Sequence, residues 1–99
     1  MTIHIGNMHY SKPTGIVIYC GRPSALENTY IIGKHGDRNA VCDSYDRDFP
    51  EKVKTPGPFR DAIIEIYHLA RTNDVTLMCY CTPRRCHCDT IKAFIDQFL

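Results

Sequence analysis

The chain lacks a hydrophobic run long enough to cross a membrane. A membrane-spanning helix needs about 20 consecutive apolar residues, and no segment of this 99-residue sequence approaches that length. The first residues, Met1 to Gly6, also lack the charged start and the apolar stretch of a secretory signal peptide. We therefore expect a cytoplasmic protein that does not bind membranes.

An excess of charge of one sign is also absent. Twelve Lys and Arg residues stand against eleven Asp and Glu residues, which gives a formal net charge of +1. This balance excludes a strongly basic nucleic-acid coat and an acidic tail, although it permits a local basic patch. Repeats and low-complexity segments are missing too. With 43% hydrophobic residues, the composition is typical of one globular domain over residues 1–99.

Two apolar runs predict buried strands. Residues 15–20 and 75–81 are rich in β-branched, aromatic and sulfur-containing side chains and show no polar alternation. Such runs are typical of strands that are covered on both faces. Residues 3–5 predict a short first strand, and residues 29–33 predict a weaker strand or extended segment.

Helical periodicity indicates about three helices. Asp37 is a suitable N-cap for the first helix, which Pro50 is expected to end. Apolar residues from Phe59 to Ala70 recur at helical spacing and predict the second helix. Asp89 is expected to cap the last helix. Since helices between buried strands favour right-handed crossovers, we predict a small α/β domain with a mainly parallel sheet.

Four of the six cysteines lie within ten residues. They are Cys79, Cys81, Cys86 and Cys88. A secreted disulfide scaffold would instead spread its cysteines to close long loops. The C-x-x-C spacing of dithiol oxidoreductases is missing as well, so a redox role is the weakest interpretation. The remaining two, Cys20 and Cys42, are expected in the core.

The loops after the two buried strands carry the chemically unusual residues. In an open α/β sheet, ligands bind beyond the carboxyl ends of the strands. One loop begins at Cys20 and carries Arg22, and the other extends to His87 just before a helix. If the strands are parallel, both loops lie at one edge, where an arginine and a helix N-terminus are suited to hold an anion.

Two uses of the cysteine-rich loop stay open. The first is a zinc site, because zinc takes four sulfur or nitrogen ligands in a tetrahedron. Its ligands would be Cys79, Cys81, Cys86 and either His87 or Cys88. The second is a thiol-based active site, in which Cys81 or Cys86 is a thiolate with a lowered pKa and His87 is the acid/base or orienting group. Adjacent residues usually face different directions, so Cys81 with His87 is the easier pair.

Several motifs resemble a known family. The segment Gly21–Gly33, GRPSALENTYIIG, resembles the GR-x-SPLGNPF-x-IG segment of small bacterial, archaeal and phage proteins named domain of unknown function 4326. Residues 36–45 resemble the helix start that follows it. Cys79–Asp89, CYCTPRRCHCD, resembles the CWC-x-P-x-x-CH-x-D signature of that family. Glu27 and Tyr80 depart from the family pattern, which usually has Gly and Trp there.

The resemblance implies a Rossmann-like fold related to nucleotide-handling domains. The family pattern usually has no cysteine at position 88. On this basis the zinc candidates become Cys79, Cys81, Cys86 and His87.

The leading hypothesis is a domain that binds a small anionic, nucleotide-like ligand and processes it as a hydrolase or transferase. The candidate catalytic residues are Cys81, Cys86 and His87. The candidate ligand-binding residues are Arg22, Ser24, Asn28, Arg38 and Asp89. The alternative is a non-enzymatic interaction protein, such as a phage protein that inhibits a host protein, in which the cysteine cluster is structural, with or without zinc.

Overall fold

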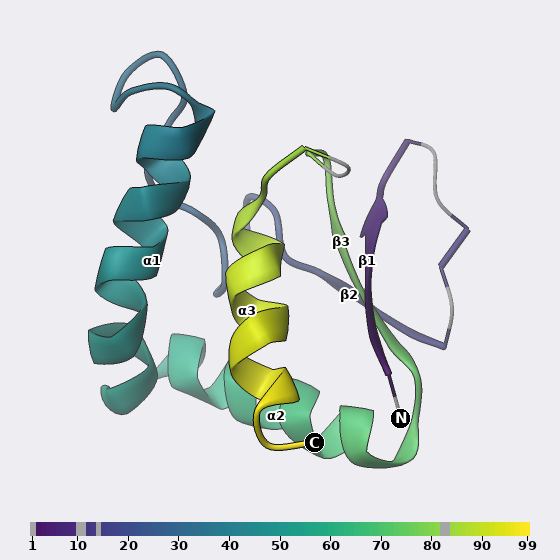
Figure 1. Cartoon of the computed structure of the whole chain (residues 1–99). Coiled ribbons are helices and arrows are strands. Elements are labelled where there is room, and N and C mark those ends of the chain that lie inside the picture. The colour runs from purple at the N-terminus through teal and green to yellow at the C-terminus, as the bar shows by residue number, and fades with distance from the viewer. Residues whose placement is uncertain (1, 10–11, 14, 82–83) are drawn as a thin grey trace.

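Figure 1 shows a computed structural model of the chain, which describes residues 2–9, 12–13, 15–81 and 84–99. Within these residues, three strands and three helices follow one another in the order β1, β2, α1, α2, β3 and α3. The strands are β1 (Ile3–Asn7), β2 (Ile16–Tyr19) and β3 (Val75–Cys79). The helices are α1 (Arg38–Lys54), α2 (Pro58–Thr72) and α3 (His87–Asp96).

The three strands form a parallel sheet in the order β1–β3–β2. Val75 at the start of β3 is in register with both Ile3 and Ile16. At the other end, Cys79 is opposite Asn7 of β1. The prediction of a small α/β fold with a parallel sheet is therefore confirmed. All strands point the same way, so the carboxyl ends of β1 and β3 lie at the upper edge of the sheet in Figure 1.

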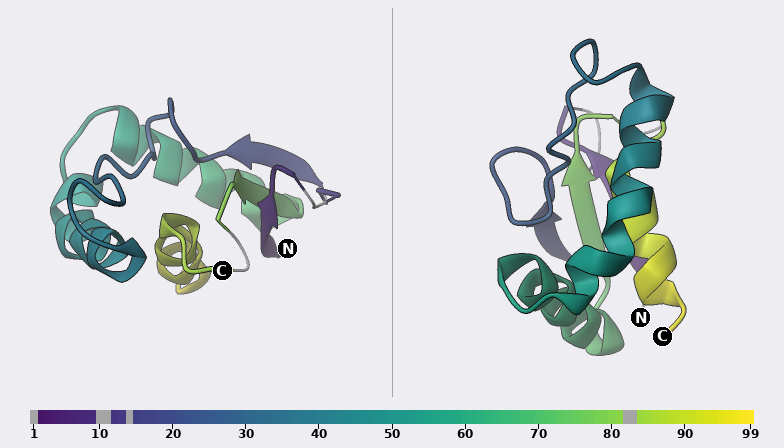
Figure 2. Two further views of the ribbon diagram at one scale, coloured as in Figure 1. Left: turned by 90° about the horizontal axis from the view of Figure 1, so that it is seen from above. Right: turned by 90° about the vertical axis from the view of Figure 1, so that its left-hand side faces the viewer.

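Helices and sheet share one hydrophobic core. Helix α3 packs against β1 and β3, and α1 lies on the far side of α3 from the sheet (Figures 1 and 2). Every residue of β3 is buried, as expected for the central strand. Ile66, Leu77, Ile91 and Ile95 are among the largest fully buried side chains. Among the described residues, no helix has both the length and the apolar character that crossing a bilayer requires.

Helix α1 begins where the sequence predicts and ends later. The Asp37 carboxylate accepts a hydrogen bond from the backbone N–H of Ala40 at 2.9 Å, so the predicted N-cap is confirmed. The prediction that Pro50 ends the helix is wrong, because α1 continues to Lys54. Proline removes one backbone donor. Burial of Phe49 just before it favours the continued helix, since tertiary packing supplies most helical stability.

Residues 29–33, predicted as a weaker strand or extended segment, form no strand: residues 29–31 have no regular structure, and a turn covers residues 32–34. The backbone N–H of Lys34 donates to the carbonyl oxygen of Ile31 at 3.1 Å, and that of Gly33 donates to Gly36 at 2.8 Å. Gly33 and Gly36 have positive φ angles, 90° and 122°, which an extended strand does not allow. These local bonds bend the segment back toward the start of α1.

Strand β3 and helix α3 also have bounds that differ from the prediction. β3 ends at Cys79, so Cys81 lies in the following loop and strand alternation no longer sets its direction. Cys86, not Asp89, is the N-cap of α3. Asp89 is three residues further on, and its carboxylate reaches back to accept the backbone N–H of Cys86 at 3.1 Å. A carboxylate at the third helical position stabilises the start of a helix by accepting the N-cap backbone N–H and by its favourable interaction with the helix dipole.

Candidate ligand cavity and cysteine cluster

The loops after β2 and β3 lie side by side at the carboxyl edge of the sheet, as the sequence predicts. The backbone N–H of Cys20 donates to the carbonyl oxygen of Met78 at 2.9 Å, which extends the pairing of the two strands. The start of α3 joins them, because Nε2 of His87 lies 2.6 Å from the carbonyl oxygen of Cys20. Three segments that are far apart in the sequence therefore meet at one place.

A cavity of about 330 Å³ opens at this edge, next to the first turn of α1. Its apolar and aromatic lining is Tyr19, Tyr30, Ile31, Ile32, Val41 and Tyr80. Its charged, polar and sulfur-containing lining includes Arg22, Asn28, Arg38, Cys42, Cys79, Cys81, Arg85, Cys86 and His87. A mostly apolar hollow with a few convergent polar groups is the usual form of a small-molecule site.

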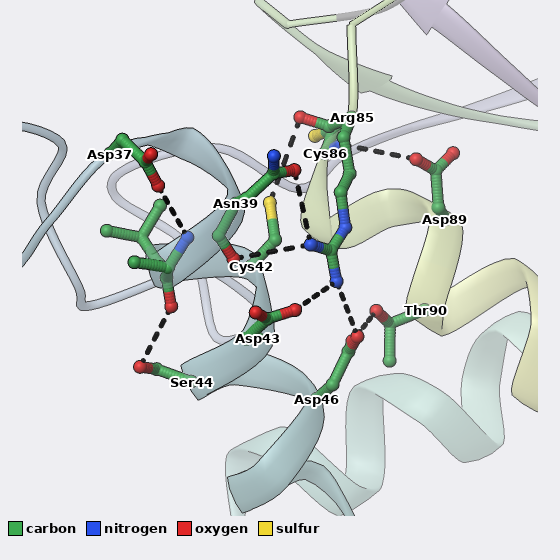
Figure 3. Close-up of polar contacts among 12 residues, drawn as sticks. Asp37, Asn39, Cys42, Asp43, Ser44, Asp46, Arg85, Cys86, Asp89 and Thr90 are labelled. Carbon is green, nitrogen blue, oxygen red and sulfur yellow. Dashed lines mark hydrogen bonds and ion pairs between the residues drawn. The ribbon is translucent and has the colours of Figure 1, made fainter.

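The three arginines in this lining have different partners. Arg85 forms ion pairs with Asp43 at 2.8 Å and Asp46 at 3.0 Å, so two carboxylates of α1 compensate its charge (Figure 3). Arg38 donates from Nη1 to the backbone carbonyl of Arg85 at 3.3 Å. Within the part of the chain that the structure describes, neither Arg22 nor Arg38 forms an ion pair with a carboxylate. Both guanidinium groups can therefore interact with an anion.

Helix α1 holds one wall of the cavity in place. The Tyr30 hydroxyl donates to the Asp48 carboxylate at 2.5 Å, and Arg47 donates to the same hydroxyl at 3.0 Å. The hydrogen bond between Tyr30 and Asp48 raises the pKa of Tyr30 and lowers the pKa of Asp48. Asn28 donates to the carbonyl oxygen of Val41 at 3.0 Å and accepts from the backbone N–H of Tyr30. The loop that carries Tyr30 is thus attached to α1 at two points.

His87 is buried and has a defined orientation. A carbonyl oxygen can only accept, so Nε2 donates to Cys20 and carries the proton. Burial lowers the pKa of His87, which favours the neutral ring with an unprotonated Nδ1. Nδ1 lies 3.5 Å from Sγ of Cys86, although the sequence favoured Cys81 as its partner. The side chains of these two adjacent residues can point toward each other because Cys86 has extended backbone while His87 begins the helix.

Beneath this cavity, buried thiols form a cluster. The Sγ atoms of Cys79, Cys86 and Cys88 all lie within 4.8 Å of one another. Cys20 is not one of these three, but it adjoins them, because its backbone N–H pairs with Met78, the residue before Cys79. The pKa of Cys86 is raised, chiefly by its hydrogen bond with Cys79, and the pKa of Cys88 is raised chiefly by that with Cys20. The hydrogen bond with Cys79 and the burial of Cys86 thus oppose the lowered thiol pKa that is expected at the start of a helix.

Most of the residues predicted for ligand binding or catalysis line the cavity. They are Arg22, Asn28, Arg38, Cys81, Cys86 and His87. Asp89 lies in a separate hollow between α1 and α3. The Ser24 Oγ atom is buried without a hydrogen-bond partner among the described residues, and Ser24 does not line the cavity.

The sulfur cluster differs from the zinc ligands expected from the sequence. Cys79 and Cys86 belong to it, whereas Cys81 and His87 do not. Cys88 takes part instead, and Cys20, expected only as a core residue, is adjacent. The predicted parallel pairing of β2 with β3 could have indicated that Cys20 lies near the cluster. That pairing places the residue after Tyr19 beside the end of β3.

Comparison with known proteins identifies the family. The model of a domain of unknown function, DUF4326, matches residues 6–97 of the chain. The match covers nearly the whole sequence, so the chain belongs to this family, in agreement with its motifs. No curated protein and no solved structure matches the chain. The family description assigns no activity, and the function is therefore argued from the site itself.

Proposed function

We propose that this member of the DUF4326 family binds a small anionic, nucleotide-like ligand in the cavity at the carboxyl edge of its sheet. One observation supports the proposal above all others. Arg22 and Arg38, which have no carboxylate partner among the described residues, line the same cavity as several aromatic and apolar side chains. Positive charge next to an apolar wall suits a ligand that combines a phosphate with a flat ring.

The anionic part of the ligand is assigned to the two arginines. A guanidinium group can donate two parallel hydrogen bonds to a phosphate or carboxylate. The N-terminus of α3 contributes less than its position implies, because the Asp89 carboxylate already accepts the N–H of Cys86. Arg85 is likewise compensated by Asp43 and Asp46. Arg22 and Arg38 are left as the main source of positive charge.

The ring of the ligand is assigned to the aromatic side of the cavity. Tyr80 is 48% exposed and packs edge-to-face against Tyr19, with ring centroids 6.1 Å apart. Ile31 and Ile32 are exposed beside the cavity. Aromatic side chains bind nucleobases by stacking, which every base allows. The aromatic wall thus accounts for the nucleotide-like character of the proposed ligand.

Processing of the ligand is the second part of the proposal. The neutral His87 ring lines the cavity with Nδ1, the nitrogen that can accept a proton, next to the Cys86 thiol, and the thiol of Cys81 lines the same cavity. A histidine that stays neutral, as burial favours for His87, can act as a general base in hydrolases and transferases. Substitution of His87 by Gln would then abolish turnover while leaving ligand binding in place.

Binding can be tested by calorimetry with a panel of nucleotides, nucleotide sugars, unphosphorylated nucleosides and inorganic phosphate. We expect a nucleotide to bind more tightly than its nucleoside or phosphate alone. Arg22→Ala and Arg38→Ala should each weaken binding about tenfold or more, the usual effect of losing a charged hydrogen bond. Arg60→Ala, which removes an exposed arginine of α2, is the control. Absence of binding by the wild type, or equal affinity for Arg22→Ala, would refute the proposal.

The alternative function, a non-enzymatic protein that binds another protein, is favoured by a different observation. Apolar side chains on α2 and at the C-terminus, Ile64, Phe98 and Leu99, are between 41% and 59% exposed. Exposed apolar groups that lie close together often mark protein interfaces. Under this alternative no nucleotide binds, and Arg22→Ala behaves like the wild type in every assay.

A further inference from the structure

Four buried cysteines come together from three separate segments. Cys20 follows β2, Cys79 ends β3, and Cys86 and Cys88 lie at the start of α3. Each is at most 3% exposed. No disulfide joins any of the six cysteines of the chain, all of which the structure describes. The sulfur atoms therefore meet as thiols in a region closed to solvent.

Ordinary core packing does not need such a gathering. A buried cysteine usually acts as a small apolar side chain and has apolar neighbours. Cys42 is an example from this chain: it is buried, and its thiol donates to the carbonyl oxygen of Arg85 at 3.8 Å, away from the cluster. Clustered cysteines on neighbouring loops are instead typical of metal ligands.

The spacing of the sulfur atoms is close to that around a zinc ion. Zinc binds four thiolates at about 2.3 Å in a tetrahedron, which places the sulfur atoms about 3.8 Å from one another. The Sγ atoms of Cys79, Cys86 and Cys88 already lie within 4.8 Å of one another. Binding of the ion would require these sulfur atoms to approach one another by up to about 1 Å. Cys20 is outside this group of three, but its backbone N–H pairs with Met78, which precedes Cys79. As the fourth ligand, its thiol would have to turn from the carbonyl oxygen of Ile18, which is 3.7 Å away, toward the other three.

We propose that Cys79, Cys86, Cys88 and Cys20 bind one structural zinc ion beneath the ligand cavity. Four thiolates in a tetrahedron suit zinc better than magnesium or calcium, which require oxygen ligands. A site with four protein ligands has no open position, so its role is structural. The site does not depend on nucleotide binding, and either proposal can fail without the other.

The ion would connect the parts of the protein that build the cavity. It would join the end of β2, the end of β3 and the first turn of α3, although Cys20 and Cys88 are 68 positions apart in the sequence. Arg22 is two residues from one ligand, and His87 lies between two others. Zinc would thereby hold both in position. Cys86 would be a ligand rather than a nucleophile, which leaves Cys81 as the reactive thiol of the cavity.

Native mass spectrometry and metal analysis of the full chain, purified without chelators from zinc-supplemented cells, test the proposal. We expect one zinc per chain. Cys79→Ser and Cys88→Ser should lose the metal. Cys42→Ser, which alters a buried thiol outside the cluster, and Cys81→Ser, which alters a thiol of the cavity, should both retain it. Cys20→Ser should bind zinc about tenfold or more weakly; unchanged affinity would remove Cys20 from the site.

A second measurement on the wild type remains decisive if the cluster variants do not fold. Replacement of zinc by Co²⁺ should produce the intense visible absorption of a tetrahedral thiolate site. The proposal is overturned if the wild type binds neither zinc nor cobalt after reconstitution, if it holds iron instead, or if Cys88→Ser retains the wild-type zinc content.

Discussion

The His87 ring donates a hydrogen bond to the carbonyl oxygen of Cys20, at 2.6 Å and across 67 positions in the sequence. This bond joins the first turn of α3 to the end of β2. It also sets the tautomer of the ring, because Nε2 must carry the proton. The cavity, the cysteine cluster and the loop with Arg22 all border this contact. The contribution of this hydrogen bond to the free energy of unfolding can be measured by substitution of His87.

Substitution of His87 by Ala should destabilise the domain. The change removes a buried hydrogen bond and leaves the carbonyl oxygen of Cys20 without its donor, which costs about 1–3 kcal/mol. Urea unfolding followed by circular dichroism measures the difference in free energy of unfolding. His68→Ala, on the exposed side of α2, is the matched control and should change stability by less than about 0.5 kcal/mol. Equal effects of the two substitutions would contradict the role of the bond.

The pair Tyr30 and Asp48 should make stability depend on acid pH. The pKa of Asp48 is lowered in the folded protein, so its contribution is complete above the usual Asp pKa of about 3.9 and is lost as pH falls through the folded value. Asp48→Asn should therefore be less stable than the wild type at neutral pH, and the difference should vanish in acid. Both side chains are partly exposed to solvent, so the effect is small.

Denaturation midpoints at a series of pH values test this dependence. Asp61→Asn, an exposed carboxyl group in the first turn of α2, is the control with the same chemical change. A difference between Asp48→Asn and the wild type that stays constant from neutral pH into acid would show that the carboxylate charge does not support the Tyr30 loop.

Truncation of Leu77 to Ala should be among the most damaging changes. Leu77 lies at the centre of the middle strand and is fully buried. Leucine-to-alanine changes in a core cost about 2–5 kcal/mol, because packing is lost and a cavity remains. Val17→Ala on β2, where the side chain is 48% exposed, should cost much less. Denaturant unfolding of both variants checks the burial of β3, and equal losses would argue against the strand order.

Cys81 should react with iodoacetamide before any other cysteine of the native protein. It is the partly exposed cysteine, while the other five are buried. The thiolate is the form that reacts, and the reagent can reach it only where the thiol is accessible to solvent. Peptide mapping by mass spectrometry identifies the modified residue, and denatured protein, in which all six should react, is the control. Early modification of Cys42 or Cys88 instead would contradict the burial of these two thiols and the exposure of Cys81.

Several features of the protein could be predicted from sequence alone because local patterns determine them. Apolar runs without alternation identified β2 and β3 as strands, and the spacing of Phe59 to Ala70 identified α2. The prediction that both strands are buried holds for β3 and is wrong for β2, which lies at the edge of the sheet and is only partly buried. Asp37 specified the start of α1. Parallel pairing then followed from chain connectivity, and with it the meeting of two loops at one edge of the sheet. Each of these inferences needs only neighbouring residues or the handedness of a crossover.

Tertiary packing alone decided the rest. The position of β3 between β1 and β2, the continuation of α1 past Pro50 and the pairing of Arg85 with two carboxylates of α1 depend on residues distant in sequence. The sequence revealed that sulfur is concentrated near α3, and the fold selected which sulfur atoms meet. Cys20 and Cys88 are neighbours because two strands pair and a helix packs on them, and no local pattern encodes that distance.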